Sequence, residues 1–191
     1  MKEYSLKSEA ELIQQLQRND EQALAALMRL YYNDLYNYGA RFTDDTALIK
    51  DCIQEIFISL WQRRETADTI LSPRYYFLRA TKNKILKALY KHLQPASLSS
   101  LQPDYDSFYE FSIEQITIEN QVNEEKTQKL RNTLALLSKK QKEIIYLKYY
   151  QYLDHGQIAE LMNLNRQSVY NLLHETIHKL RTLLRPEFIA Q

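Results

Sequence analysis

The sequence has few of the residues that form turns, disulfides or metal sites: one cysteine, two glycines and four prolines among 191 residues. So little glycine and proline leaves β-hairpins almost without turn residues, which argues against an all-β fold. The single cysteine, Cys52, excludes an internal disulfide and a multi-cysteine metal site. No apolar run approaches the roughly 20 residues of a membrane span, and no signal-peptide pattern opens the chain. We therefore expect a cytoplasmic protein without direct membrane insertion.

Motifs of enzymes are also missing. The chain has no glycine-rich phosphate loop and no nucleophile motif. Among its four histidines, only His174 and His178 have a spacing that suits zinc, and a solvated polar helix face is the favoured interpretation of that pair. We therefore predict a protein that is not an enzyme, with no catalytic residues, no metal site and no cofactor.

Apolar residues recur every three or four positions through most of the chain, a period typical of helices. The expected helices are about 20–42, 46–64, 73–92, 113–136 and 138–150, followed by two helices within 154–185. Residues 93–112 lack any sustained period and are rich in Ser, Pro, Gln and Asp, as linkers are. The prediction is an all-α fold with two small helical domains, residues 1–92 and 113–191, joined by an acidic flexible linker, 93–112.

The last predicted helices read as a helix-turn-helix. Asp154 and Gln157 form a capping-box pattern at its start. In the final helix the apolar positions define one face, and the polar residues fall opposite them. These polar residues are Gln167, Tyr170, Asn171, His174, His178 and Arg181. Such a helix fits the major groove of DNA, and the alternative is a purely structural helical hairpin.

Charge is unevenly distributed although the net charge is only +1. Residues 72–91 hold six basic and no acidic side chains, and residues 93–121 hold five acidic and no basic ones. Tyr75, Tyr76, Phe77 and Tyr90 alternate with the cations of the basic segment. Cations attract phosphates and aromatic rings stack on unpaired bases, so this segment suits single-stranded or melting DNA. In the alternative interpretation, the aromatic residues face the core and the lysines only confer solubility.

Two stretches carry a family resemblance. The run Asp51-Cys52-Ile53-Gln54-Glu55-Ile56-Phe57-Ile58-Ser59-Leu60-Trp61 resembles the polymerase-binding signature of bacterial extracytoplasmic-function sigma factors. The run from Leu137 to Leu147, followed by Ile158-Ala159-Glu160-Leu161 and Leu180-Arg181, is similar to the second domain of that family. Order, spacing and length agree from about residue 20 to 184.

The resemblance implies a role for each block in the N-terminal domain. Asp51, Gln54 and Glu55 would bind core RNA polymerase at the clamp helices of its largest subunit, although without the resemblance Asp51 and Glu55 read as a solvated pair. The basic segment would bind and help melt the minus-ten promoter element, with Asn83 or a tyrosine reading a flipped base. The implied minus-ten residues are Arg74, Tyr75, Tyr76, Arg79, Lys82, Asn83, Lys84 and Lys87.

The final helix would bind the minus-thirty-five element as duplex, because residues near the start of a recognition helix reach base edges. The implied residues are Arg166, Gln167, Ser168, Tyr170, Asn171 and His174. Many relatives carry several Arg or Lys residues where this chain has Tyr170 to Glu175. We therefore expect phosphate attraction to come more from Lys139, Lys140, Lys142 and Arg181.

The function implied is that of an alternative sigma factor. Its partners would be core RNA polymerase, promoter DNA and an anti-sigma factor, which in this family is often membrane-anchored. Two other classes stay open: a helix-turn-helix regulator, which gains nothing from the Asp51 to Trp61 signature, and a protein-binding adaptor, which needs neither basic segment. Alanine at Asp51, Gln54 and Glu55 would leave the activity of such a regulator intact.

Overall fold

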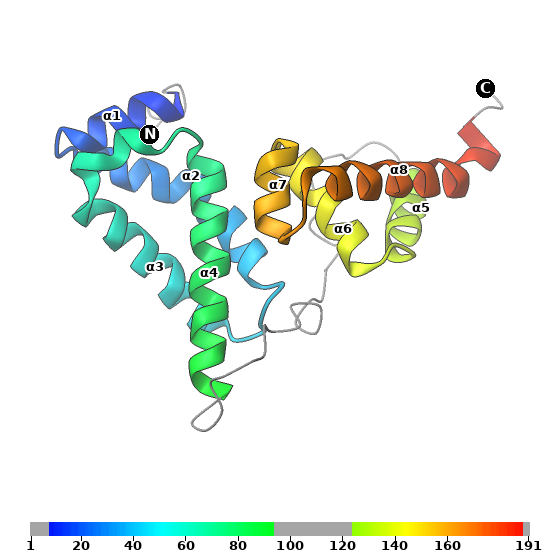
Figure 1. Cartoon of the computed structure of the whole chain (residues 1–191), viewed down its shortest axis with the longest axis horizontal. Coiled ribbons are helices and arrows are strands. Elements are labelled where there is room, and N and C mark those ends of the chain that lie inside the picture. Colours follow the sequence, from blue (N-terminus) through cyan, green and yellow to red (C-terminus); the bar gives the residue numbers. More distant parts are fainter. Residues whose placement is uncertain (1–7, 94–123, 189–191) are drawn as a thin grey trace. The chain divides into compact units, whose positions relative to one another are not determined.

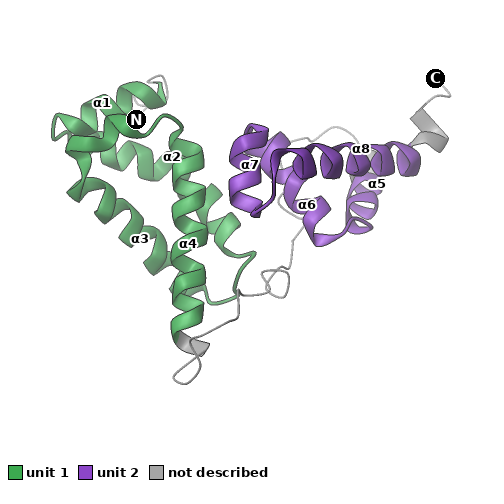
Figure 2. Cartoon of the chain, in the orientation of Figure 1, with its two compact units in different colours: residues 1–108 green, residues 109–191 purple. Residues whose placement is uncertain are grey.

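A computed structural model describes residues 8–93 and 124–188, and all regular structure within these ranges is helical (Figure 1). The expected all-α class is confirmed. The chain divides into two compact units, residues 1–108 and 109–191, called here the N-terminal and C-terminal units (Figure 2). The predicted linker falls almost wholly outside the described residues, so its flexibility and the boundaries at 92 and 113 stay predictions.

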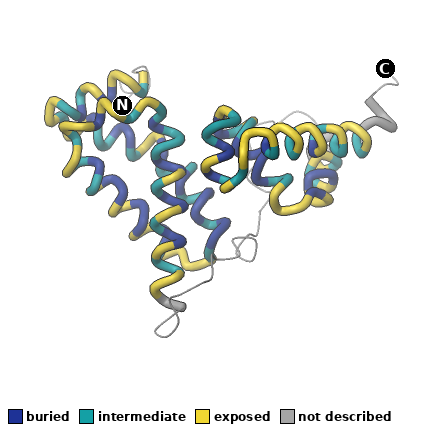
Figure 3. The backbone as a smooth tube through the Cα atoms, viewed as in Figure 1, coloured by how far each residue is buried: buried dark blue, intermediate teal, exposed yellow. Residues whose placement is uncertain are grey.

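The N-terminal unit is a bundle of helices joined by short turns. Its elements are α1 (Glu9–Gln17), α2 (Glu21–Gly39), α3 (Thr46–Gln62), the 3-10 turn η2 (Arg64–Thr69) and α4 (Pro73–Leu93). Helices α2, α3 and α4 pack against one another, and α1 packs on α2 and η2. Buried positions recur along each helix, as the periodic apolar residues require (Figure 3).

Polar side chains set the beginnings of these helices. Asp20 caps α2 by accepting a hydrogen bond from the Gln22 amide, and Asp45 caps α3 through the Leu48 amide. Pro73 occupies the first position of α4, where its missing N–H costs no hydrogen bond because a backbone N–H there has no partner within the helix. The predicted starts are thus confirmed to within a residue. Helix α1, with its own capping box of Ser8 and Glu11, was not predicted.

Phe77 of α4 lies at the centre of the core of this unit. Its side chain is fully buried, with its ring centroid 4.7 Å from that of Tyr31 on α2 and 5.1 Å from that of Phe57 on α3. Three helices therefore meet on one aromatic ring. Cys52 of α3 is buried beside this core, and burial raises the pKa of its thiol.

Gly39 permits the close approach of α2 to both neighbouring helices. A Cβ atom at this position would lie 2.9 Å from Ile49 Cγ2 on α3 and 2.9 Å from Ile85 Cδ1 on α4. Gly39→Ala is therefore expected to lower the free energy of unfolding by about 1–3 kcal/mol through overpacking. Urea denaturation measures this.

Gly156→Ala is the control for that substitution. A Cβ there would lie 3.1 Å from Nη2 of the flexible Arg166 side chain and 3.1 Å from Asp154 Oδ1, which are longer distances than those at Gly39. Alanine favours helix over glycine, and we expect Gly156→Ala to change stability by less than about 1 kcal/mol. Equal stability of Gly39→Ala and the wild type would contradict the tight packing of α2.

The C-terminal unit is built around its last helix. Its elements are α5 (Glu124–Ala135), α6 (Lys139–Ile145), the π-helical turn η5 (Tyr146–Tyr150), α7 (His155–Met162) and α8 (Arg166–Phe188). Helix α8 packs on α5, α6 and α7, burying Val169 and Thr176 completely. The predicted capping boxes, Ser138 with Gln141 and Asp154 with Gln157, are confirmed.

For two helices of this unit, the structure describes fewer α-helical residues than the sequence predicts. The helix expected to reach Tyr150 changes at Tyr146 into a π-helical turn, which closes with a hydrogen bond from the Gln151 amide to the Tyr146 carbonyl. Of the helix expected over 113–136, the structure shows Glu124–Ala135, and 113–123 lie outside the described residues. None of the described helices combines the length and apolar character needed to cross a membrane.

Candidate nucleic-acid interface

One exposed face of α3 carries the predicted polymerase-binding residues. Asp51, Gln54 and Glu55 are all exposed, and their spacing places them on the same side of the helix. Ile58 continues this face and is 55% exposed. The residues between them, among them Ile53, point into the core. We call Asp51, Gln54, Glu55 and Ile58 the α3 stripe.

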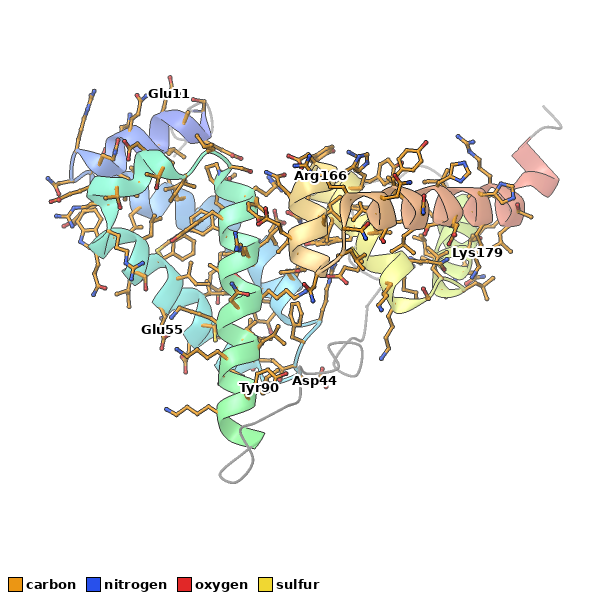
Figure 4. All side chains as sticks on the ribbon, in the orientation of Figure 1. Glu11, Asp44, Glu55, Tyr90, Arg166 and Lys179 are labelled. Carbon is orange, nitrogen blue, oxygen red and sulfur yellow. The ribbon has the colours of Figure 1, made fainter. Side chains whose placement is uncertain are left out.

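An ion pair connects the α3 stripe with the basic helix α4. Lys84 Nζ lies 2.5 Å from Glu55 Oε2, and Glu55 is labelled on α3 in Figure 4. The hydrogen bond from Lys84, and then its charge, hold the pKa of Glu55 below its usual range, with a smaller effect from Lys87. Exposed ion pairs contribute only about 0–1 kcal/mol. A partner that binds Glu55 can therefore displace Lys84 at little cost.

The predicted minus-ten residues divide between an exposed and an inward-facing group. Arg79, Asn83 and Lys87 are exposed and recur every four residues, so they form one face of α4. Lys82 is only 9% exposed, and its ammonium lies 5.9 Å from the centroid of the Phe42 ring. Tyr75, Tyr76 and Lys84 are half-buried. The exposed face of α4 is thus Arg79, Asn83 and Lys87.

Arg74 connects α4 to α2. Its Nη1 donates to Asp34 Oδ2 at 3.2 Å, and its guanidinium carbon lies 5.7 Å from the centroid of the Tyr31 ring. Further along α4, Arg79 Nη1 donates to the Tyr75 hydroxyl at 3.2 Å. The basic segment therefore presents tyrosine and arginine side chains already held against each other, and its cations do not all face solvent.

The first turns of α8 carry the predicted minus-thirty-five residues. Arg166, Gln167, Tyr170, Asn171 and His174 are exposed, and Ser168 is half-buried. Gln167 Nε2 donates to Asn171 Oδ1 at 2.9 Å, and the rings of Tyr170 and His174 stack with centroids 6.4 Å apart. The exposed face is therefore made of two side-chain pairs, each at i and i+4.

The start of α8 lies beside the start of α7. Asn163 ends α7 in the left-handed conformation, with φ 52°, which asparagine tolerates. The chain then turns back, and the guanidinium of Arg166, labelled in Figure 4, lies over Gly156, with Nη2 3.1 Å from where a Cβ would be. Exposed cations are also present at Lys139, Lys140 and Arg181, whereas Lys142 is half-buried.

Comparison with known families identifies these two units. Residues 27–93 match the model for sigma-70 region 2, and residues 127–180 match the model for sigma-70 region 4, so together the models match more than half of the chain. The chain belongs to the sigma-70 family. The resemblance to sigma factors is thereby confirmed, and the chain is an alternative sigma factor that acts with RNA polymerase in promoter-directed transcription.

A solved structure has a similar fold. This chain superposes on CnrH with a TM-score of 0.51 and 16% sequence identity. The match covers 93% of this chain and 97% of that chain. CnrH was solved in complex with the cytosolic domain of CnrY. A search of curated proteins found no match.

The matched regions contain all the predicted site residues of this sigma factor. Region 2 spans most of α2 and all of α3 and α4, and region 4 spans the helices from within α5 to Leu180 of α8. The role of each individual residue stays a prediction. Within residues 8–93 and 124–188, no cluster of His, Cys, Asp or Glu is arranged to hold a metal ion.

Sequence reasoning missed two ion pairs that join helices of the N-terminal unit. Glu55 and Lys84 are 29 positions apart, and Asp34 and Arg74 are 40 positions apart. Neither spacing leaves a signal in a single sequence, because periodicity describes only neighbours within one helix. Ile58 could have been predicted from helical periodicity, because it follows Glu55 by three residues and is an apolar residue on a polar helix face.

Proposed function

We propose that this sigma factor binds core RNA polymerase through the α3 stripe and directs it to promoters with two DNA-binding surfaces. The observation that carries the proposal is the exposure of Asp51, Gln54 and Glu55 on the face of α3 opposite its buried residues. A helix anchored by a packed core presents these groups at fixed positions, which limits the entropy lost on binding. The clamp helices of the largest subunit are the proposed partner.

Helix α4 is the proposed minus-ten surface. Its exposed face of Arg79, Asn83 and Lys87 combines cations for phosphates with an amide for a base edge. Stacking on Tyr75 or Tyr76 would favour unpaired bases over duplex, and that difference in affinity supplies the free energy for melting. The half-buried tyrosines stand next to the exposed cations on the same helix.

Helix α8 is the proposed minus-thirty-five surface. A recognition helix reads base edges with side chains near its start, where Gln167 and Asn171 are exposed. Gln167 donates one hydrogen bond to Asn171, so the Gln167 carbonyl oxygen and the remaining N–H groups of the pair can still bind DNA. The major-groove edge of adenine requires one acceptor and one donor from the protein.

A tethered cleavage reagent tests both assignments. Because Cys52 is buried, a reagent attached to Asn83→Cys or to Gln167→Cys reacts selectively with the introduced thiol. On a promoter fragment at which the holoenzyme starts RNA synthesis, cuts from position 83 are expected around the minus-ten element and cuts from position 167 around the minus-thirty-five element. Cuts at exchanged places, or none near the promoter, would overturn the assignments.

Gln167→Ala and Asn171→Ala are expected to weaken promoter binding sequence-specifically. Loss of a base contact removes about 1–3 kcal/mol of discrimination, so the preference of the holoenzyme for the native upstream box over a scrambled one should fall about 5- to 100-fold. Competition binding measures this preference. Arg181→Ala is the control: it should weaken binding to both boxes alike and reduce the salt dependence. Unchanged preference in both alanine variants would exclude this pair from base reading.

An anti-sigma factor is the proposed regulatory partner. CnrH was solved in complex with the cytosolic domain of CnrY. By analogy, we propose that this chain binds the cytosolic part of a membrane-anchored inhibitor. The regulator and adaptor alternatives predict that the α3 stripe is dispensable. The polymerase-binding measurement described in the Discussion therefore separates them from the sigma role.

A further inference from the structure

Tyr152, in the turn between η5 and α7, has an unusual backbone. Its φ is 52°, in the left-handed region, and its side chain is 82% exposed. Among the described residues, the other non-glycine positions with positive φ are Asn19 and Asn163. Asparagine tolerates this conformation, whereas a bulky aromatic side chain is strained in it. A residue that is costly for the backbone thus occupies a site where its side chain adds almost no packing.

The neighbours of Tyr152 explain why the chain must turn there. Gln151 is buried and donates from Nε2 to the Tyr146 hydroxyl at 2.7 Å, and Leu153 is buried with its amide donating to the Leu147 carbonyl at 3.1 Å. The backbone passes between two buried residues, and glycine or asparagine would make this turn more cheaply. Folding therefore accounts for the turn but not for the tyrosine. Strain kept at an exposed position points to a function of the side chain.

The position of the turn indicates the partner. Tyr152 is two residues before Asp154, the cap of α7, and the first turn of α7 contacts Arg166 at the start of α8 through Gly156. In a helix-turn-helix the first helix crosses the DNA backbone while the second reads bases. A side chain just before α7 is therefore placed on the phosphate side of the groove that α8 occupies.

We propose that the Tyr152 hydroxyl donates a hydrogen bond to a backbone phosphate of the duplex bound by α8. Tyrosine is a common phosphate donor and carries no sequence information. The left-handed backbone directs the side chain away from the buried residues on either side of it, Gln151 and Leu153, and leaves its hydroxyl accessible to a ligand. This inference rests on the proposed minus-thirty-five role of α8, and its test must distinguish the failure of one from the failure of the other.

Two substitutions separate the hydroxyl from the backbone. Tyr152→Phe keeps the turn and removes only the donor, so holoenzyme affinity for a fluorescent promoter fragment should fall about tenfold or more, as for one hydrogen bond to a charged group. Tyr152→Asn should lose as much affinity, while the melting temperature of the protein rises by about 2–6 °C because the strain is relieved. Tyr149→Phe, an exposed tyrosine on η5, is the matched control and should leave affinity unchanged.

The salt dependence and three further outcomes complete the test. Since tyrosine is uncharged, Tyr152→Phe should lower affinity equally at every salt concentration. If Tyr152→Phe binds like the wild type while Gln167→Ala is impaired, the inference is wrong and the role of α8 stands. If neither substitution weakens binding, the role of α8 itself fails. If Tyr152→Phe weakens binding to core polymerase without DNA, Tyr152 contacts polymerase and the phosphate contact is overturned.

Discussion

Alanine at Asp51, Gln54 and Glu55 together is expected to lower the affinity for core RNA polymerase by about 100-fold or more. A few well-placed residues carry most of the binding free energy of an interface, and loss of one central residue commonly costs about 2 kcal/mol or more. The three side chains share one exposed face of α3 and contribute little to the packing of the helix. The loss should therefore appear in binding and transcription, with helicity and melting temperature unchanged.

Equilibrium binding of labelled protein to core polymerase, without DNA, measures this effect. Asp68→Ala removes an exposed carboxylate from η2 of the same unit and is the matched control. Lys84→Ala adds a second control, since it removes the partner of Glu55 but leaves the carboxylate in place, and it should change affinity by no more than about fivefold. Near-normal affinity of the triple variant would remove the α3 stripe from the polymerase interface and favour the regulator interpretation.

Phe77→Ala is expected to destabilise the N-terminal unit by about 3–5 kcal/mol. The ring is fully buried against Tyr31 and Phe57, so its removal leaves a cavity where α2, α3 and α4 meet. Domains of this size have about 5–15 kcal/mol of total stability, so such a loss removes a large share of it and, at the lower end of that range, unfolds much of the unit. Polymerase binding would weaken to the same extent that the unit unfolds.

Urea denaturation followed by circular dichroism measures the loss, with Tyr90→Ala as the control on the same helix. Tyr90 is 38% exposed, and its replacement should change the free energy of unfolding by less than about 1 kcal/mol. Phe77→Leu should restore part of the stability by filling the cavity. If Phe77→Ala is no less stable than Tyr90→Ala, the three helices do not share this core.

Helix positions were predictable where periodicity and capping residues agree. Asp20, Asp45 and Pro73 begin α2, α3 and α4, and apolar residues at helical spacing form their buried sides. In the C-terminal unit, the capping boxes at Ser138 and Asp154 placed α6 and α7. Such signals are local, because a cap satisfies amides within one turn of itself.

Two other features of the fold were missed, for different reasons. Helix α1 is short, although the spacing of Ser8 and Glu11 and the apolar Leu12, Ile13 and Leu16 were a readable signal. The π-helical turn was missed because no sequence period reveals it; a buried hydrogen bond from Gln151 Nε2 to the Tyr146 hydroxyl spans this turn.

The basic residues of α4 illustrate the limit of charge as a guide to the site. Lys82 was expected to bind the minus-ten element with the other cations, yet only 9% of it is accessible, because a long aliphatic stem can pack on apolar neighbours. Arg74 joins Asp34 on α2. Composition identified a basic helix, but the tertiary structure decides which of its charges are exposed.

Mapping of transcription start sites tests the central claim most directly. Core polymerase would transcribe fragmented genomic DNA of the source organism with and without this protein, and the 5′ ends of the transcripts would be sequenced. The sigma role predicts new start sites that share two upstream boxes, and the Asp51, Gln54 and Glu55 alanine variant should abolish them. A protein that binds core polymerase and DNA but produces no new start sites would contradict it.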